Sequence, residues 1–185
     1  MKTRKILSIA LFALVFGATS FAQKSVMVGG AEMYPTKNII QNAMNSKDHT
    51  TLVSAVKAAG LVETLESAGP FTVFAPTNEA FDKLPKGTVD TLLKPENLKM
   101  LQSILTYHVV AGKMSSSDLK KAIKAGNGKA MLKTVNGGIL TVSMKGNQLT
   151  ITDENGGNSM VTIADVFQSN GVIFVIDTVL MPKQK

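Results

Sequence analysis

The sequence contains no cysteine, and this absence excludes several kinds of chemistry. A disulfide framework, a thiol nucleophile, thiolate ligation of zinc or iron–sulfur clusters and lipid attachment through cysteine all require that side chain. The 185 residues must therefore be held together by packing, and with 44% hydrophobic and 18% charged residues the chain has enough apolar material for a core. We expect a globular protein of about single-domain size.

Arginine is nearly as scarce, occurring once, at Arg4. It belongs to a basic start that precedes an apolar run at residues 6–16, which is too short for a stable transmembrane anchor. Small side chains at Ser20 and Ala22 suit a signal peptidase. We therefore predict a signal peptide at residues 1–22, cleavage between Ala22 and Gln23, and a secreted or periplasmic protein without a membrane span. The alternative is an uncleaved membrane anchor.

Signal cleavage would also change the charge of the protein. It removes three basic residues and no acidic one, so the formal net charge drops from +7 to +4. No arginine would remain, and because its forked guanidinium recognises phosphates and guanine edges, nucleic acid is not an expected partner. We expect the remaining lysines to be spread along the chain rather than clustered, with at most a mild attraction to anionic envelopes.

Motifs for catalysis are also missing. The chain has two histidines, His49 and His108, and neither lies in a known catalytic spacing such as H-E-x-x-H. There is also no G-x-S-x-G nucleophile elbow, and residues 126–129 (GNGK) lack the remaining glycine and the Ser or Thr of a phosphate loop. Residues 153–158 (DENGGN) resemble a calcium loop, but Gly157 and Ala164 occupy ligand positions, so we interpret the segment as a hairpin turn. We expect no catalytic residue, no metal and no cofactor. An enzyme whose mechanism is built from dispersed carboxylates is kept as an alternative, because such a mechanism leaves no local motif.

The spacing of apolar residues changes along the chain from helical to strand-like. Up to about residue 125 they recur at i, i+3 and i+4 between glycine and proline stops, whereas later runs are short and separated by Asn-Gly turns. One early run, 71–75, is rich in β-branched and aromatic residues and must join the later sheet. The predicted fold class is therefore α+β. We expect helices at 36–44, 51–59, 61–65, 77–84, 88–93, 95–106 and 116–125. A run of β-forming residues at 107–110 predicts a further strand, and later strands are expected at 130–135, 139–144, 148–152, 159–167 and 172–180.

Four ordered segments resemble the signature blocks of fasciclin-type domains. They are residues 71–81 (FTVFAPTNEAF), 105–110 (LTYHVV), 135–142 (VNGGILTV) and 171–182 (GVIFVIDTVLMP). The resemblance implies a β-wedge or sandwich-like sheet with several α-helices packed at one side. It also implies an exported, non-enzymatic protein that is used in adhesion or matrix contacts and needs no cofactor. One position departs from the pattern: Phe174 replaces a histidine found in many relatives, so no role of that imidazole is transferred.

The resemblance covers about residues 45–182, and the segment before it is similar to the lead-in of single-domain bacterial members. We accordingly divide the chain into a signal peptide (1–22), a lead-in strand and helix (23–44), a fasciclin domain (45–182) and a C-terminal tail (183–185). The expected partner is a protein or polysaccharide of the cell surface or matrix. The alternative function is that of a binding protein for a small apolar ligand, for which the abundant Leu, Val and Met are the only support.

The resemblance also supplies candidate partner-binding residues. In animal matrix members the Tyr-His segment is proposed to bind receptors, which makes Tyr107 and His108 candidates here, and we add the acid Asp177 of the closing block. From the residues themselves we favour a packing role for all three, with partner contact as the alternative. Val109 and Val110 follow the histidine with apolar side chains, and a polar group in such surroundings is more often satisfied by backbone groups than presented to a partner.

Overall fold

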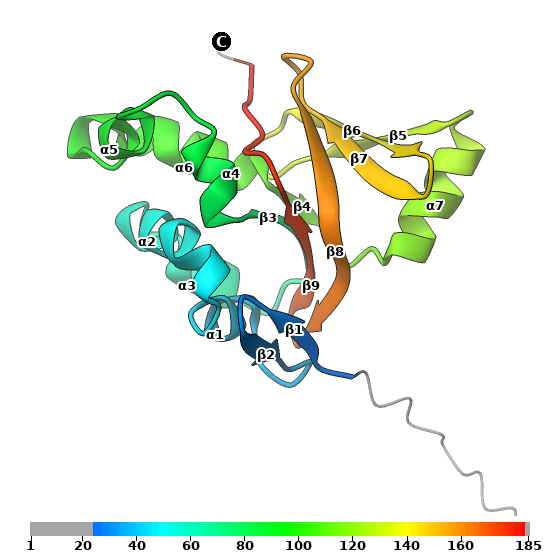
Figure 1. Cartoon of the computed structure of the whole chain (residues 1–185), viewed down its shortest axis with the longest axis horizontal. Helices are drawn as coiled ribbons and strands as arrows, with labels where there is room; N and C mark the ends of the chain where they lie inside the picture. Colours follow the sequence, from blue (N-terminus) through cyan, green and yellow to red (C-terminus); the bar gives the residue numbers. More distant parts are fainter. Residues whose placement is uncertain (1–23, 184–185) are drawn as a thin grey trace, which may run out of the picture.

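The computed structural model describes residues 24–183, so the predicted signal peptide, its cleavage site and most of the predicted C-terminal tail lie outside the described part of the chain. A curved sheet separates two groups of helices (Figure 1). The helices are α1 Ile39–Ala43, α2 Thr50–Ala58, α3 Val62–Glu66, α4 Asn78–Asp82, α5 Thr88–Leu92, α6 Leu98–Tyr107 and α7 Ser116–Ala125. The strands are β1 Val26–Val28, β2 Ala31–Met33, β3 Phe71–Pro76, β4 Val109–Ala111, β5 Lys129–Lys133, β6 Ile139–Lys145, β7 Gln148–Thr152, β8 Asn158–Gln168 and β9 Gly171–Ile176.

Side-chain caps fix where several helices begin. Asn38 and Gln41 form a reciprocal capping box at α1, so this helix begins three residues later than the expected start at residue 36. The Thr77 hydroxyl accepts a hydrogen bond from the Ala80 N–H at the start of α4. A second capping box joins Ser115 to the third helical residue of α7. These local bonds satisfy backbone donors that each helix leaves unpaired.

The main sheet has seven strands in the order β4-β3-β9-β8-β7-β6-β5. β3 pairs in parallel with β9, and the other neighbouring pairs are antiparallel. The early strand therefore joins the later sheet as expected, and the α+β class is confirmed. The sheet curls so far that its two edges meet. Val110 of the edge strand β4 forms a bridge with Thr134, directly after the other edge strand, β5. This curl gives the wedge that the resemblance implied.

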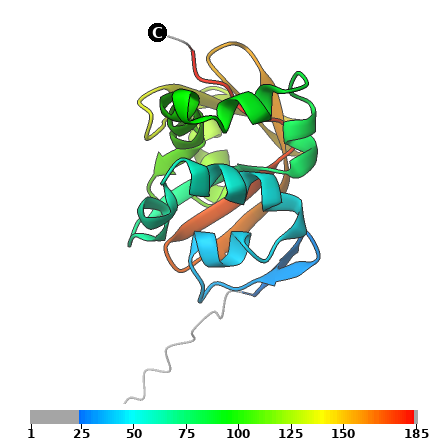
Figure 2. The ribbon, with the colours of Figure 1, turned by 90° about the vertical axis from the view of Figure 1, so that its left-hand side faces the viewer.

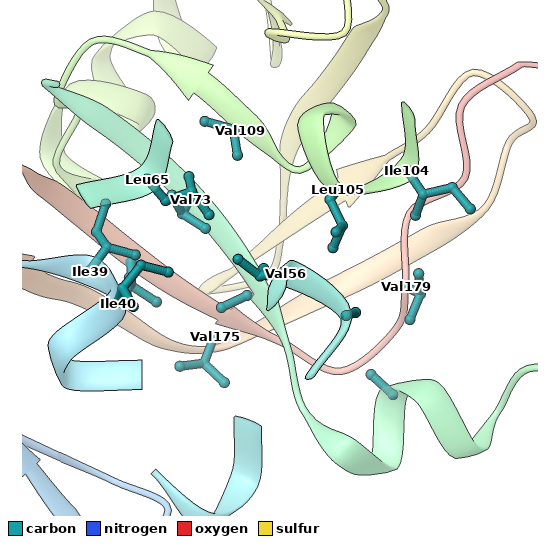
Figure 3. Packing of buried hydrophobic residues seen from close by; sticks show 14 of the residues in the cluster. Ile39, Ile40, Val56, Leu65, Val73, Ile104, Leu105, Val109, Val175 and Val179 are labelled. Carbon is teal, nitrogen blue, oxygen red and sulfur yellow. The ribbon is translucent and has the colours of Figure 1, made fainter. Parts of the chain in front are cut away.

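Alternating side chains of the central strands supply two separate cores. Val73 of β3 and Val175 of β9 face the layer of helices α1–α6, whose apolar side chains converge on them (Figure 3). Phe74 and Phe174 face the opposite side, where α7 covers the sheet, and their ring centroids lie 5.7 Å apart. Phe174, which replaces the family's histidine, is thus a fully buried packing residue.

The two helical groups differ in size. Figure 2 shows α1–α6 from their own side, with strands β8 and β9 passing behind them. α7 lies at the far end of the sheet, against β5 and β6 (Figure 1). Among residues 24–183, none of the helices has the length and apolar content needed to cross a bilayer.

Candidate functional site

Tyr107 and His108 lie at the junction between α6 and β4. Tyr107 is the last residue of α6 and His108 is its C-cap, so the strand that was expected from residue 107 begins at Val109. Their side chains are 0% and 3% exposed. Neither side chain therefore offers surface to a partner in this conformation, and a contact through them stays a prediction.

The imidazole of His108 is held by backbone groups on both sides. Nδ1 lies 2.8 Å from the Ile104 carbonyl oxygen, and Nε2 accepts a hydrogen bond from the Leu180 N–H at 3.0 Å. Since Nε2 is an acceptor, Nδ1 carries the proton and the ring is neutral. Burial lowers the pKa of His108 to about 4, because the charged form would lose its solvation. The ring is therefore a neutral link between α6 and the segment after β9.

The Tyr107 hydroxyl joins two hairpin turns. It donates to the Ile139 carbonyl oxygen at 2.9 Å and accepts from the Glu154 N–H at 3.1 Å. Burial raises the pKa of Tyr107 to about 12, so the phenol stays protonated and able to donate. A Cβ added at Gly138 would lie only 2.7 Å from the tyrosine ring, which explains why the turn before β6 has glycine at this position.

Asp153, which we expected only to form a hairpin turn, also contacts the segment that His108 bonds. Oδ1 accepts from the N–H groups of Asn155 and Gly157, at 2.9 and 2.8 Å, which fixes the turn between β7 and β8. Oδ2 accepts from the Met181 N–H at 3.0 Å. The segment is the turn that the sequence predicted. The acid–x–Asn–Gly–Gly pattern was a signal for this local geometry but not for the bond to Met181.

Asp177 is the candidate residue whose side chain reaches solvent. It follows β9, and its side chain is 25% exposed. Oδ1 accepts from the Met160 N–H at 2.8 Å, and Lys83 Nζ lies 3.4 Å from Oδ2. Partial burial raises the pKa of Asp177, but the Met160 N–H, the Thr178 hydroxyl and Lys83 together hold it below its usual range. Asp177 is therefore an ionised carboxylate at the surface.

The structure brings the signature segments together without making one reactive surface. In the segment after β9, the Leu180 N–H donates a hydrogen bond to His108 and the Met181 N–H donates one to Asp153. Asp177 lies at the start of this segment, beside β8. The titratable groups of Tyr107, His108 and Asp153 all bond to backbone N–H or C=O groups. These bonds hold chain segments in position relative to one another. Within residues 24–183, no cluster of three or more His, Asp or Glu side chains could hold a metal ion.

An apolar cavity of about 60 Å³ lies between the helical layer and β3. Its walls are mostly aliphatic and aromatic, and the polar residues among them are His49, Thr64, Thr106 and His108. His49 is 1% exposed, its Nδ1 lies 2.9 Å from Ser46 Oγ, and its Nε2 is buried without a hydrogen-bond partner. Burial lowers the pKa of His49. Because ligand pockets usually measure about 300–1,000 Å³, this cavity has room for only a few heavy atoms.

Comparison with known proteins gives a consistent result. A family model described as the Fasciclin domain matches residues 47–182. The chain is 43% identical to Protein sll1483 of Synechocystis sp. over 160 residues, which cover 86% of this chain and 82% of that protein. It is 41% identical to Immunogenic protein MPB70 of Mycobacterium bovis over 145 residues, covering 76% of this chain and 66% of that protein.

Two further matches come from animals. Transforming growth factor-beta-induced protein ig-h3 of Sus scrofa is 41% identical over 131 residues, which cover 71% of this chain and 17% of that protein. Among solved structures, a FAS1 domain pair from the insect cell adhesion molecule Fasciclin I matches with a TM-score of 0.70 at 20% identity, covering 78% of this chain and 51% of that chain. At this identity the solved structure supports the fold.

Proposed function

The chain belongs to the fasciclin domain family, and from this premise we propose that it is a non-enzymatic exported protein that mediates adhesion. It would make weak contacts with a protein or polysaccharide of the cell surface or the extracellular matrix. The observation that carries the proposal is the family match over residues 47–182, combined with the fold of a domain pair from an insect cell adhesion molecule. Fasciclin domains are generally non-catalytic and typically extracellular.

The geometry of the signature segments supports a binding protein rather than an enzyme. Tyr107 and His108 would contribute to partner binding by positioning the two turns and the segment after β9, since their own side chains are buried. Asp177 would be the direct contact, because its carboxylate is ionised and partly exposed. An ionised surface carboxylate can accept hydrogen bonds from the hydroxyl, amide or ammonium groups of a partner.

Co-sedimentation with the native envelope or matrix fraction tests this proposal. We expect the purified protein to be retained at low salt, and Asp177→Asn to be retained less than wild type. Asp90→Asn is the matched control, because it removes the same charge from the exposed helix α5. A wild-type protein that stays in the supernatant across several preparations contradicts the adhesion proposal. Equal retention of the two variants removes Asp177 from the contact.

The second candidate function is storage or transport of a small apolar molecule in the cavity beside His49. The almost entirely apolar lining of the cavity is the observation that favours it. The volume of about 60 Å³ argues against any ligand of ordinary size unless the helices move apart. Native mass spectrometry of protein purified from its own source distinguishes the two functions, since a copurifying small molecule favours the second.

We also propose that the protein reaches the exterior or the periplasm through the predicted signal peptide. Intact-mass measurement of the exported protein should give the mass of a chain that begins at Gln23. Recovery of exported protein that still carries Met1 would contradict the predicted cleavage.

A further inference from the structure

Positive charge is concentrated in one part of the chain, contrary to the expectation of evenly spread lysines. Residues 113–145 contain seven lysines and a single acid, Asp118, whereas residues 24–112 contain eight lysines and eight acids. All seven lysines are exposed. We call them the basic surface: Lys113, Lys120, Lys121, Lys124, Lys129, Lys133 and Lys145.

Six of these lysines, all except Lys113, lie on α7, β5 and β6 at one end of the molecule (Figure 1). Lys113 precedes α7 and lies over the Phe167 ring of β8, 5.1 Å from its centroid. Alternation along β5 buries Ala130 and Leu132, so Lys129 and Lys133 point outward. Lys129 pairs with Ser143, and Lys145 lies two residues further on the same face of β6, which makes the two lysines diagonal neighbours.

The helix continues the same surface. Lys120 and Lys124 are one turn apart on α7 and so lie on the same side of it. Lys120 and Lys145 border one surface hollow of about 490 Å³, and Thr162 of β8 contributes to its polar wall. Lys120 of α7 and Lys145 of β6 thus lie at the same hollow although they are 25 residues apart in the sequence.

Few acids neutralise the basic surface. Asp118 lies 4.0 Å from Lys121 in an exposed pair, which is worth little. Asp165 is occupied as a hydrogen-bond acceptor for the N–H and hydroxyl of Ser116 at the start of α7. Asp177 borders a neighbouring hollow together with Lys145, where its carboxylate can accept hydrogen bonds from sugar hydroxyls. The net field at this end of the molecule is therefore positive and favours an anionic partner.

We infer that the basic surface binds an acidic polysaccharide, a polymer of sugars that carry carboxylate groups. This inference rests on the proposed function and names the class of partner. Lysine ammonium groups are mobile point charges, suited to a flexible chain of spaced carboxylates, and residues 24–183 contain no arginine fork for rigid two-point recognition of an anion. Thr141 and Ser143 lie between the lysines on the outer face of β6 and can bond sugar hydroxyls.

Two other polyanions fit the basic surface less well. Residues 113–145 contain no aromatic side chain, and Lys113 lies over the half-buried ring of Phe167, so stacking of bases from single-stranded nucleic acid is disfavoured. An amphipathic helix binds a membrane surface through an apolar face flanked by basic residues. The apolar face of α7 already packs on the sheet, and on β5 the large apolar side chain that is exposed is Met131 alone, which is too little apolar surface for such a contact. A hydrated, hydroxyl-rich polymer is the partner that this surface matches.

Binding of the purified protein to immobilised polygalacturonate tests the inference, with neutral dextran as the reference polymer. The test variant is Lys129→Gln/Lys133→Gln/Lys145→Gln. The control variant, Lys86→Gln/Lys94→Gln/Lys99→Gln, loses the same charge from exposed positions around α5 and α6. Thermal unfolding followed by circular dichroism checks that both variants keep the fold. Binding of anionic vesicles and of single-stranded DNA is measured in parallel.

We expect wild type to bind polygalacturonate and not dextran, with binding that weakens as salt screens the charges. The test variant should lose about tenfold in affinity, because exposed ion pairs are each worth about two- to fivefold, and the control should change little. Equal losses in both variants, or tighter binding to vesicles or DNA, overturn the inference. If the protein binds the native envelope fraction but not polygalacturonate, the inference fails and the adhesion proposal stands. If the protein binds neither, the adhesion proposal fails too.

Discussion

Acidification should destabilise this protein through the buried imidazole of His108. In the folded state the ring is neutral, because Nε2 accepts the Leu180 N–H and the site is closed to solvent. In the unfolded chain the same ring takes up a proton at its ordinary pKa of 6.5. Below that pH the unfolded state binds one more proton than the folded state, so stability decreases as the pH falls. The loss continues until the pH reaches the folded pKa of about 4.

The size of this effect follows from the two pKa values. The interval between 6.5 and about 4, at about 1.4 kcal/mol for each pH unit, corresponds to about 3 kcal/mol of stability. Replacing His108 with Gln removes the titration and keeps an acceptor for Leu180. The variant should cost about 1–3 kcal/mol at pH 7, because the Ile104 carbonyl loses its donor. Wild type should then lose about 3 kcal/mol more than the variant between pH 7 and pH 4.

Urea unfolding followed by circular dichroism at pH 7, 6, 5 and 4 measures this difference. Carboxylates and His49 are common to both proteins, so their contributions cancel in the comparison. NMR titration of the wild-type imidazoles gives a second reading that does not depend on the variant, because the His108 resonances should not shift between pH 8 and pH 5. Parallel stability curves for the two proteins, or a normal titration of His108, would refute the buried neutral ring.

Two further predictions concern the links between segments. Tyr107→Phe should lower the free energy of unfolding by about 1–3 kcal/mol, because the Ile139 carbonyl and the Glu154 N–H both lose their hydrogen-bond partner. Urea titration measures this change, and an unchanged midpoint would show that water replaces the hydroxyl. Asn170→Ala should lower the free energy of unfolding by about 3 kcal/mol or more in the same assay. The buried amide of Asn170 accepts a hydrogen bond from the Ile39 N–H and donates one to the Leu65 carbonyl, and both bonds would be lost. A loss below about 1 kcal/mol would contradict this prediction.

The order of helices and strands was predictable because it depends on local pattern. The early strand was assigned from its β-branched and aromatic residues, and its parallel pairing with β9 confirms that assignment. The ends of elements were harder to predict. Tyr107 looked like the start of a strand, but it completes the buried face of α6 with Ile104. β9 ends at Ile176, earlier than expected, because Asp177 turns its carboxylate to β8 and interrupts the ladder.

The contacts of the candidate site could not be predicted, because they join residues that are distant in the sequence. The bond from Leu180 to His108 spans 72 residues, and that from Met181 to Asp153 spans 28. A local pattern carries no signal for such pairs. The basic surface was missed although the sequence carried a signal for it, the seven lysines and single acid of residues 113–145. What the sequence did not show is the placement of six of these lysines at one end of the molecule, which depends on the pairing of β5 with β6 and the packing of α7 on both.

Attachment of cells to immobilised protein is the most direct test of the central claim that this fasciclin-domain protein is an adhesion protein. Cells of the source organism would be allowed to settle on a surface coated with the purified protein, or with an inert protein of similar charge, and the attached cells counted after washing at low salt. The account predicts more attachment to the fasciclin-domain coating, and release of those cells by soluble polygalacturonate. Attachment no greater than that on the inert coating would contradict it.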